Sequence, residues 1–147
     1  MGAMLESRTI GVSIQKEWRA VYEFARRPEN FARWASGAAG SLRREGDDWV
    51  ADGPDGRAIL RFAERNDLGV LDHWVILASG VEIYMPVRAV PNGSGCEVTV
   101  TLFRQPGMSD DVFARRRLGG QGSGRPEGAA RNLTVHRRES CHGKLGE

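Results

Sequence analysis

The stretch Arg8-Thr-Ile-Gly-Val-Ser-Ile14, followed by Trp18-Arg-Ala-Val-Tyr-Glu-Phe24 and Pro28-Glu-Asn-Phe-Ala-Arg-Trp34, decides the fold. In the first segment apolar residues alternate with small or polar ones, which predicts a half-buried strand. In the second segment apolar side chains recur every three or four residues, which predicts an amphipathic helix. Pro28 suits the first turn of a second helix, because its missing N–H would have no partner there. Two helices this short cannot bury their aromatic side chains against each other, so we expect them to lie on a sheet.

That sheet is predicted by the alternating segments that follow. Six strands are expected, over residues 41–45, 48–52, 57–63, 70–77, 81–90 and 96–103, separated by turns rich in Gly, Pro, Asn and Asp. Pro86 interrupts the fifth of them and predicts an edge position or a bulge. Ser109, which is followed by two aspartates, predicts the start of a final helix. The expected class is therefore α+β, with a curved antiparallel sheet and helices on its concave side.

The chain divides into a body and a tail of different composition. We expect one ligand-binding domain over residues 7–114 and a separate tail over residues 115–147. The tail holds eight Lys/Arg against three Asp/Glu and seven glycines, without helical periodicity, so it is predicted to be disordered. Residues 1–114 hold 13 basic and 16 acidic residues, a net charge of −3, and have no basic stripe, so no nucleic-acid partner is expected.

The tail also has the composition of a GC-rich reading frame shifted by one base. We hypothesise that it replaces a natural C-terminal helix. Sequencing the source DNA tests this hypothesis, because the absence of an amphipathic helix from both alternative frames would refute it.

Several functional classes lack their sequence signals. No apolar run reaches the roughly 18 residues of a membrane span and no secretory signal is visible, so we expect no membrane insertion and a cytoplasmic location. Cys96 and Cys141 lie far apart, which does not suggest a disulfide framework. His136, Cys141 and His142 lack zinc-site spacing, and neither a phosphate-binding loop nor a dinucleotide fingerprint occurs. We therefore expect neither a metal nor a cofactor.

Five segments carry a resemblance to a known superfamily. They are the strand Ile10–Ile14, Trp18–Phe24 with Pro28–Trp34, Gly69-Val-Leu-Asp-His-Trp-Val75, Tyr84-Met-Pro-Val-Arg88, and Thr101-Leu-Phe-Arg-Gln-Pro-Gly-Met108. Over roughly residues 7–113 the chain resembles the SRPBCC superfamily (START, polyketide cyclase-dehydratase and Bet v 1-like proteins), in particular small bacterial members. The resemblance implies a helix-grip fold, in which a seven-stranded antiparallel sheet wraps around a long C-terminal helix and encloses a cavity.

The C-terminus departs from this resemblance. Relatives continue after the position of Ala114 with an acidic, Leu-rich helix, and this chain does not. Losing the apolar face of that helix would expose the cavity wall, which favours self-association. A homodimer that covers the open face is therefore one of our expectations.

His73 is the body's only histidine and the first candidate for catalysis. An imidazole with a pKa near 6.5 can act as a general acid or base close to neutral pH. Asp72 points to the opposite face of the strand, so it cannot orient the ring as a sequence neighbour. The alternative interpretation is a structural histidine at the centre of a strand.

The strand over residues 81–90 leaves two interpretations open. Glu82, Tyr84 and Arg88 share one face, and if that face looks into the cavity they can bind a carboxylate, a phenol or a carbonyl. If it looks outward, the cavity is lined instead by Ile83, Met85 and Val87. The bulge expected at Pro86 prevents a decision from alternation alone.

The main functional hypothesis is binding of a small hydrophobic or aromatic molecule in the cavity. Most aromatic side chains are expected to be plain core, with Phe31 and Trp34 the best candidates for the cavity entrance. The full set of predicted ligand-binding residues is Phe31, Trp34, Phe62, Trp74, Tyr84, Met85 and Phe103. The alternative is a cyclase or dehydratase in which the catalytic candidates His73, Tyr84 and Arg88 move protons or polarise a carbonyl. A third hypothesis is the product of a shifted gene without activity.

Overall fold

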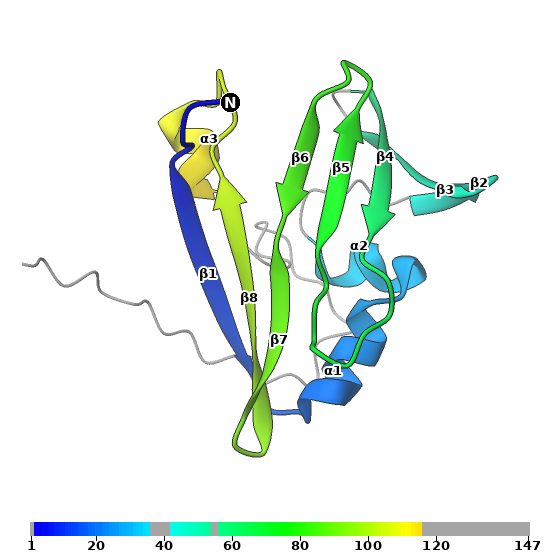
Figure 1. The fold of residues 1–147 in the computed structure, drawn as a ribbon, viewed down its shortest axis with the longest axis vertical. Helices are drawn as coiled ribbons and strands as arrows, with labels where there is room; N and C mark the ends of the chain where they lie inside the picture. Colours follow the sequence, from blue (N-terminus) through cyan, green and yellow to red (C-terminus); the bar gives the residue numbers. More distant parts are fainter. Residues whose placement is uncertain (1, 36–41, 54–55, 116–147) are drawn as a thin grey trace, which may run out of the picture.

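The protein is an α+β structure in which two antiparallel sheets carry short helices on one side. The computed structural model describes residues 2–35, 42–53 and 56–115 (Figure 1). In chain order the elements are β1 (Ser7–Ile14), α1 (Trp18–Ala25), a 3-10 turn (Pro28–Asn30), α2 (Phe31–Trp34), β2 (Leu42–Glu45), β3 (Asp48–Gly53), β4 (Gly56–Phe62), β5 (His73–Leu77), β6 (Glu82–Met85), β7 (Val87–Asn92), β8 (Gly95–Phe103) and α3 (Asp110–Arg115). This order confirms the expected fold class at the level of α+β.

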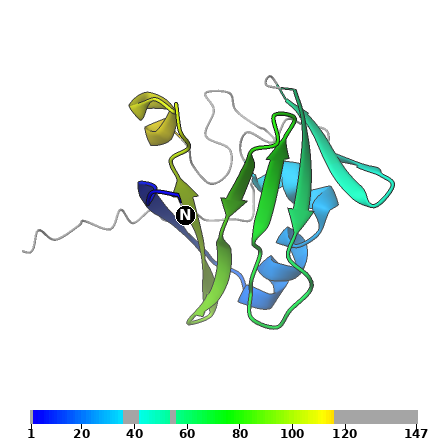
Figure 2. The ribbon, with the colours of Figure 1, turned by 45° about the horizontal axis from the view of Figure 1, so that its top comes forward.

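The first two helices begin where local chemistry places them. The carboxylate of Glu17 accepts hydrogen bonds from the backbone N–H groups of Arg19 and Ala20, so α1 starts at Trp18. Pro28 occupies the first turn of the second helical segment, as predicted, although this turn is 3-10 before it becomes α2. Both helices lie on the far side of β4 and β5 in Figure 1, and Figure 2 shows the same arrangement.

The strands form two antiparallel sheets, in the orders β1-β8-β7 and β2-β3-β4-β5-β6. Strands β6 and β7 follow one another directly and link the two sheets, with Pro86 between them (Figure 1). Proline has no N–H for a sheet ladder, which explains the break there. The Pro86 carbonyl still accepts a hydrogen bond from Thr101 N at 3.0 Å, so β8 spans the junction. The single predicted strand over 81–90 is thus two strands.

Alternation continues across Pro86 and settles which face the helices cover. Ile83, Val87 and Ala89 are buried, whereas Tyr84 and Glu82 are exposed. We call the buried side, on which α1, α2 and α3 pack, the helix face, and the other side the opposite face. The interpretation in which Glu82, Tyr84 and Arg88 line the helix-covered side is therefore wrong.

The helix face carries two clusters of buried apolar residues. The larger one joins Tyr22 of α1 and Phe113 of α3 to the inward residues of β7 and β8, namely Val87, Ala89, Cys96, Val98, Val100 and Leu102, together with Leu71. The smaller one contains Phe31, Ala51 and Leu60 and has partly buried side chains around it. The larger cluster thus packs α1 and α3 against β7 and β8, and the smaller one packs α2 against β3 and β4.

The final helix begins as predicted. The Ser109 hydroxyl accepts a hydrogen bond from Val112 N at 3.3 Å. The Arg8 guanidinium donates to the carbonyls of Phe113 and Ala114 at 3.0 and 2.9 Å, which fastens the end of α3 to β1. Residues 36–41, 54, 55 and 116–147 lie outside the described residues, so all of the predicted tail over 115–147 except Arg115 is outside them.

Candidate ligand site

Four aromatic rings from three elements meet on the helix face. Phe31 of α2 lies at the centre, with ring centroids 5.1 Å from Trp34, 5.4 Å from Phe62 and 5.1 Å from His73. Trp34 and Phe62 also contact His73, at 6.1 and 5.9 Å. All the contacts made by Phe31 and the one between Trp34 and His73 are edge-to-face, the geometry that aromatic pairs favour. We call these four residues the aromatic cluster.

Local structure explains how the aromatic cluster assembles. Phe62 ends β4 and His73 begins β5, and the two residues are paired directly across the antiparallel ladder. Their side chains therefore project to the same face. The turn at Pro28 brings Phe31 and Trp34 over that pair, and Asn30 donates to the Phe24 carbonyl at 3.0 Å to hold α2 against α1.

His73 is neutral and its tautomer is fixed by a backbone carbonyl. The side chain is 3% exposed, and its Nδ1 lies 3.2 Å from the Leu71 carbonyl oxygen. A carbonyl can only accept, so Nδ1 carries the hydrogen and Nε2 carries a lone pair. Burial lowers the pKa of His73, against the weaker opposing effects of the Leu71 carbonyl and the Asp72 carboxylate. At neutral pH the ring therefore presents a hydrogen-bond acceptor.

Trp34 presents the complementary group. Its indole Nε1 is shielded from solvent and has no hydrogen-bond partner among the residues that the structure describes. An indole N–H can only donate. Most buried donors in proteins are paired, because an unpaired one costs about 1–3 kcal/mol. The edge of the aromatic cluster thus contains a donor and an acceptor within an otherwise apolar set of rings.

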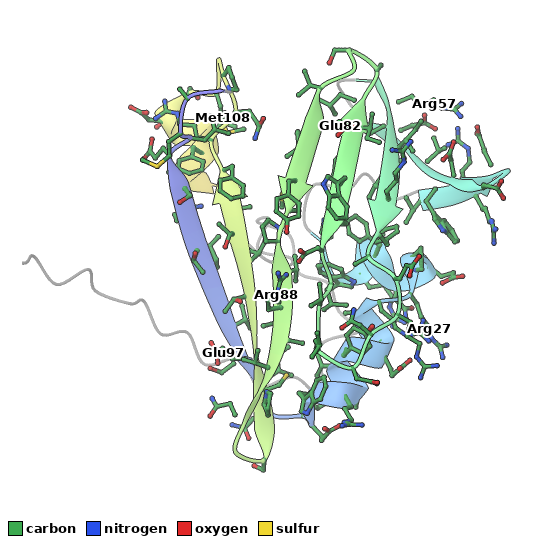
Figure 3. All side chains as sticks on the ribbon, in the orientation of Figure 1. Arg27, Arg57, Glu82, Arg88, Glu97 and Met108 are labelled. Atoms are coloured by element: carbon green, nitrogen blue, oxygen red, sulfur yellow. The ribbon has the colours of Figure 1, made fainter. Side chains whose placement is uncertain are left out.

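A different polar network occupies the opposite face. The buried carboxylate of Asp72 accepts hydrogen bonds from Tyr84 Oη at 2.5 Å, from Val87 N at 2.9 Å and from the Arg88 guanidinium. Donation to Asp72 raises the pKa of Tyr84, since losing that proton would place two negative charges side by side. Arg88 lies over β7 on the side turned away from α1 and α2 (Figure 3). This network joins β5 to the β6–β7 junction.

Aromatic side chains also line up on the opposite face. The ring of Tyr84 stacks between Trp74, at a centroid distance of 5.1 Å, and Phe103, at 6.4 Å. These rings cover one another's faces across three strands. Their packing supports the sheet from outside the helix-covered layer.

The structure therefore separates the predicted site residues into two groups. Phe31, Trp34, Phe62 and His73 come together on the helix face, and Met85 lies directly across the ladder from His73. The others lie on the opposite face: Trp74, Tyr84, Arg88 and Phe103.

The structure does not bring the catalytic candidates His73, Tyr84 and Arg88 together. Tyr84 pairs across the ladder with Trp74, whereas His73 pairs with Met85. Adjacent residues of a strand project to opposite sides, so the sheet lies between the imidazole and the other two groups. Tyr84 and Arg88 both bind Asp72 instead.

Asp72, which accepts three hydrogen bonds on the opposite face, is absent from the site residues predicted from the sequence. From the sequence we weigh it only as a partner for His73, a role that its direction excludes. A carboxylate within the apolar run Val70-Leu-Asp-His-Trp-Val75 is itself a signal, because a buried carboxylate needs donors around it. The identity of those donors depends on strand pairing, so neighbouring residues in the sequence do not reveal it.

Metal and membrane signals are absent from the described parts of the chain. No group of three or more His, Cys, Asp or Glu side chains that could hold a metal ion occurs within residues 2–35, 42–53 and 56–115. Over the same ranges, no helix combines the length and apolar character that crossing a bilayer requires.

Comparison with known proteins gives a structural likeness but no match to a family model or a curated protein. The structure is similar to the crystal structure of the Mll3558 protein from Rhizobium loti, with 16% sequence identity and a TM-score of 0.47, over 76% of this chain and 88% of that one. This likeness concerns the fold alone.

Proposed function

We propose that this protein binds a small hydrophobic or aromatic molecule on its helix face, beside the aromatic cluster. The observation that carries the proposal is the set of rings around Phe31. Phe31 and His73 are buried, each with 3% exposure. Trp34 and Phe62, which pack against them, are only partly buried. Partly covered aromatic side chains grouped with a few polar atoms are typical of ligand sites.

The expected affinity is modest. A two-ring aromatic molecule that loses about 200 Å² of apolar surface gains about 5 kcal/mol, from about 25 cal/mol per Å². Taken alone, this corresponds to a dissociation constant of roughly 0.2 mM. Titrations should therefore reach millimolar ligand.

We also propose the helix-grip architecture and membership of the SRPBCC superfamily. In support, a strand, two short helices and a series of antiparallel strands precede α3, and α3 places Phe113 on the helix face. A ligand held between that face and a C-terminal segment is the arrangement that such a fold suggests.

A ligand panel tests the binding proposal. Aromatic polyketides, flavonoids and fatty acids are added while backbone and indole N–H correlation spectra and thermal unfolding are recorded. We expect shifts centred on Trp34 and Phe31, and weaker binding in Phe31→Leu. Trp74→Phe, on the opposite face, is the matched control and should bind normally. The absence of binding across the panel would reject the proposal.

A second candidate function is proton transfer of the cyclase or dehydratase kind. The observation that favours it is the neutral His73 ring, with Nδ1 held by Leu71 and Nε2 free of partners in the part of the chain that the structure describes. His73 would act alone, since Tyr84 and Arg88 lie across the sheet. In a turnover assay with a ligand from the panel, His73→Phe should abolish the reaction while binding weakens by no more than about ten-fold. A variant that still turns the ligand over excludes this role.

The homodimer remains a prediction. Size-exclusion chromatography at several protein concentrations tests it, and a monomer throughout the series would contradict it.

A further inference from the structure

The aromatic cluster also defines the chemical class of the ligand. Building on the function proposed above, we infer that the bound molecule carries a hydroxyl group, which accepts a hydrogen bond from Trp34 Nε1–H and donates one to His73 Nε2. The ligand would then be a phenol, an enol or an alcohol on an apolar framework.

Trp34 supplies the donor of the first proposed hydrogen bond. Its Nε1 is removed from solvent but has no acceptor within the described ranges. The other three rings of the aromatic cluster are those of Phe31, Phe62 and His73, and among them only the His73 ring contains heteroatoms. A ligand that offers an oxygen lone pair would pair this donor, whereas a hydrocarbon would leave it unpaired.

His73 supplies the acceptor of the second proposed hydrogen bond. Its Nδ1–H is used by the Leu71 carbonyl at 3.2 Å, so the only remaining hydrogen-bonding position is the Nε2 lone pair. The imidazole ring lies 6.1 Å from the Trp34 ring between centroids, at an interplanar angle of 81°. Trp34 Nε1–H and His73 Nε2 therefore belong to neighbouring rings of one cluster. The first needs a hydrogen-bond acceptor and the second needs a donor.

Few ligand groups satisfy both demands. Carbonyl and ether oxygens accept but do not donate, and an ammonium group donates but does not accept. A carboxylate accepts only, and it would be buried against Phe31, Phe62 and a neutral imidazole without an opposite charge from any of them. A neutral hydroxyl both accepts and donates, which makes it the group that fits.

Three ligands of similar size separate the two hydrogen bonds. 2-Methylnaphthalene offers neither, 2-methoxynaphthalene accepts only, and 2-naphthol accepts and donates. Each hydrogen bond formed should tighten binding by about three- to ten-fold. We expect 2-naphthol to bind best, the ether next and the hydrocarbon least, as measured by isothermal titration and by N–H correlation spectra.

Two variants assign the preference to the two rings. In Trp34→Phe the ether should bind no better than the hydrocarbon, because the donor is gone. In His73→Phe the advantage of 2-naphthol over the ether should disappear, because the acceptor is gone. Trp74→Phe keeps both groups and should keep the full order of affinities. If a variant fails to fold, the wild-type protein still reports the contacts through the Trp34 indole N–H signal and the His73 ring-nitrogen shifts on adding 2-naphthol.

The outcomes distinguish this inference from the function on which it rests. The expected order, lost in the two cluster variants and kept in Trp74→Phe, supports the hydroxyl. Equal binding of all three ligands, or an order unchanged by Trp34→Phe and His73→Phe, overturns the inference and leaves the apolar site intact. Binding of none of them overturns the proposed function and the inference together.

Discussion

Replacing Asp72 by alanine should loosen the junction between the two sheets. The Asp72 side chain is 8% exposed and accepts hydrogen bonds from Tyr84, Val87 and Arg88. The three donors belong to β6 and β7, on either side of Pro86, where the ladder is interrupted. Asp72 thus supplies an acceptor to a buried N–H group at the break.

The magnitude follows from how buried each donor is. Val87 is 1% exposed, so its N–H would lose its partner without gaining water, which costs about 1–3 kcal/mol. Arg88 and Tyr84 are more than a third exposed and can turn to solvent, so together they contribute at most about 1 kcal/mol. We expect Asp72→Ala to lower the free energy of unfolding by about 1–4 kcal/mol, a large share of the 5–15 kcal/mol typical of a domain. Asp72→Asn keeps an acceptor for Val87 and should lose about half as much.

Urea unfolding followed by circular dichroism measures this loss. Glu45→Gln is the control, because Glu45 forms exposed ion pairs with Arg43 and Arg57 and should leave the midpoint unchanged. A second readout is the ionisation of Tyr84, whose raised pKa should fall towards its usual value of about 10 in Asp72→Asn. An Asp72→Ala protein within about 1 kcal/mol of wild type would refute the reasoning.

Three further perturbations test other parts of the structure. Gly69 has a φ of +71°, and a Cβ there would lie 2.0 Å from the Ala89 carbonyl oxygen, so Gly69→Ala should cost about 3 kcal/mol or more in chemical denaturation. Gly80→Ala, with a φ of +85° but open space around it, should cost only the backbone strain of about 1–2 kcal/mol; equal losses in the two variants would contradict this account. Because burial lowers the pKa of His73, the unfolded chain binds a proton before the folded protein does as the pH falls below about 6.5. Below that pH the free energy of unfolding should therefore fall by up to about 1.4 kcal/mol for each pH unit. This dependence on pH should be absent from His73→Phe. If the difference in stability between the wild-type protein and His73→Phe does not change with pH, the ring is not a buried neutral one. Arg8→Met removes the donors to the last carbonyls of α3 and should speed hydrogen exchange in α3 but not in β4, whereas unchanged exchange would show that the contact does not hold the helix.

Several features could be predicted from short stretches of sequence. Pro28 marks a helical start, Ser109 caps the last helix, and Gly46, with a φ of +61°, forms the hairpin between β2 and β3. The period-two pattern of residues 96–103 correctly identifies the buried side of β8. These features depend on backbone preferences and on neighbours a few residues away.

The composition of the candidate site was predictable only in part. The sequence placed Phe31, Trp34, Phe62 and His73 among the candidates, and the structure brings them together. It also offered residues from the opposite side of the sheet, because an aromatic residue in a strand looks the same whichever side it faces. The donor at Trp34 and the acceptor at His73 emerge only when every nearby partner is known.

The sequence by itself determined the kind and order of the elements, because each depends on local periodicity, caps and turns. Alternation along 81–90 defined two sets of side chains but not which set the helices cover. Only the tertiary structure decided that Ile83 and Val87 face the helices and that Tyr84 and Arg88 bind Asp72. The physical reason is that a strand's two faces differ only in what packs on them, and that packing comes from residues far away along the chain.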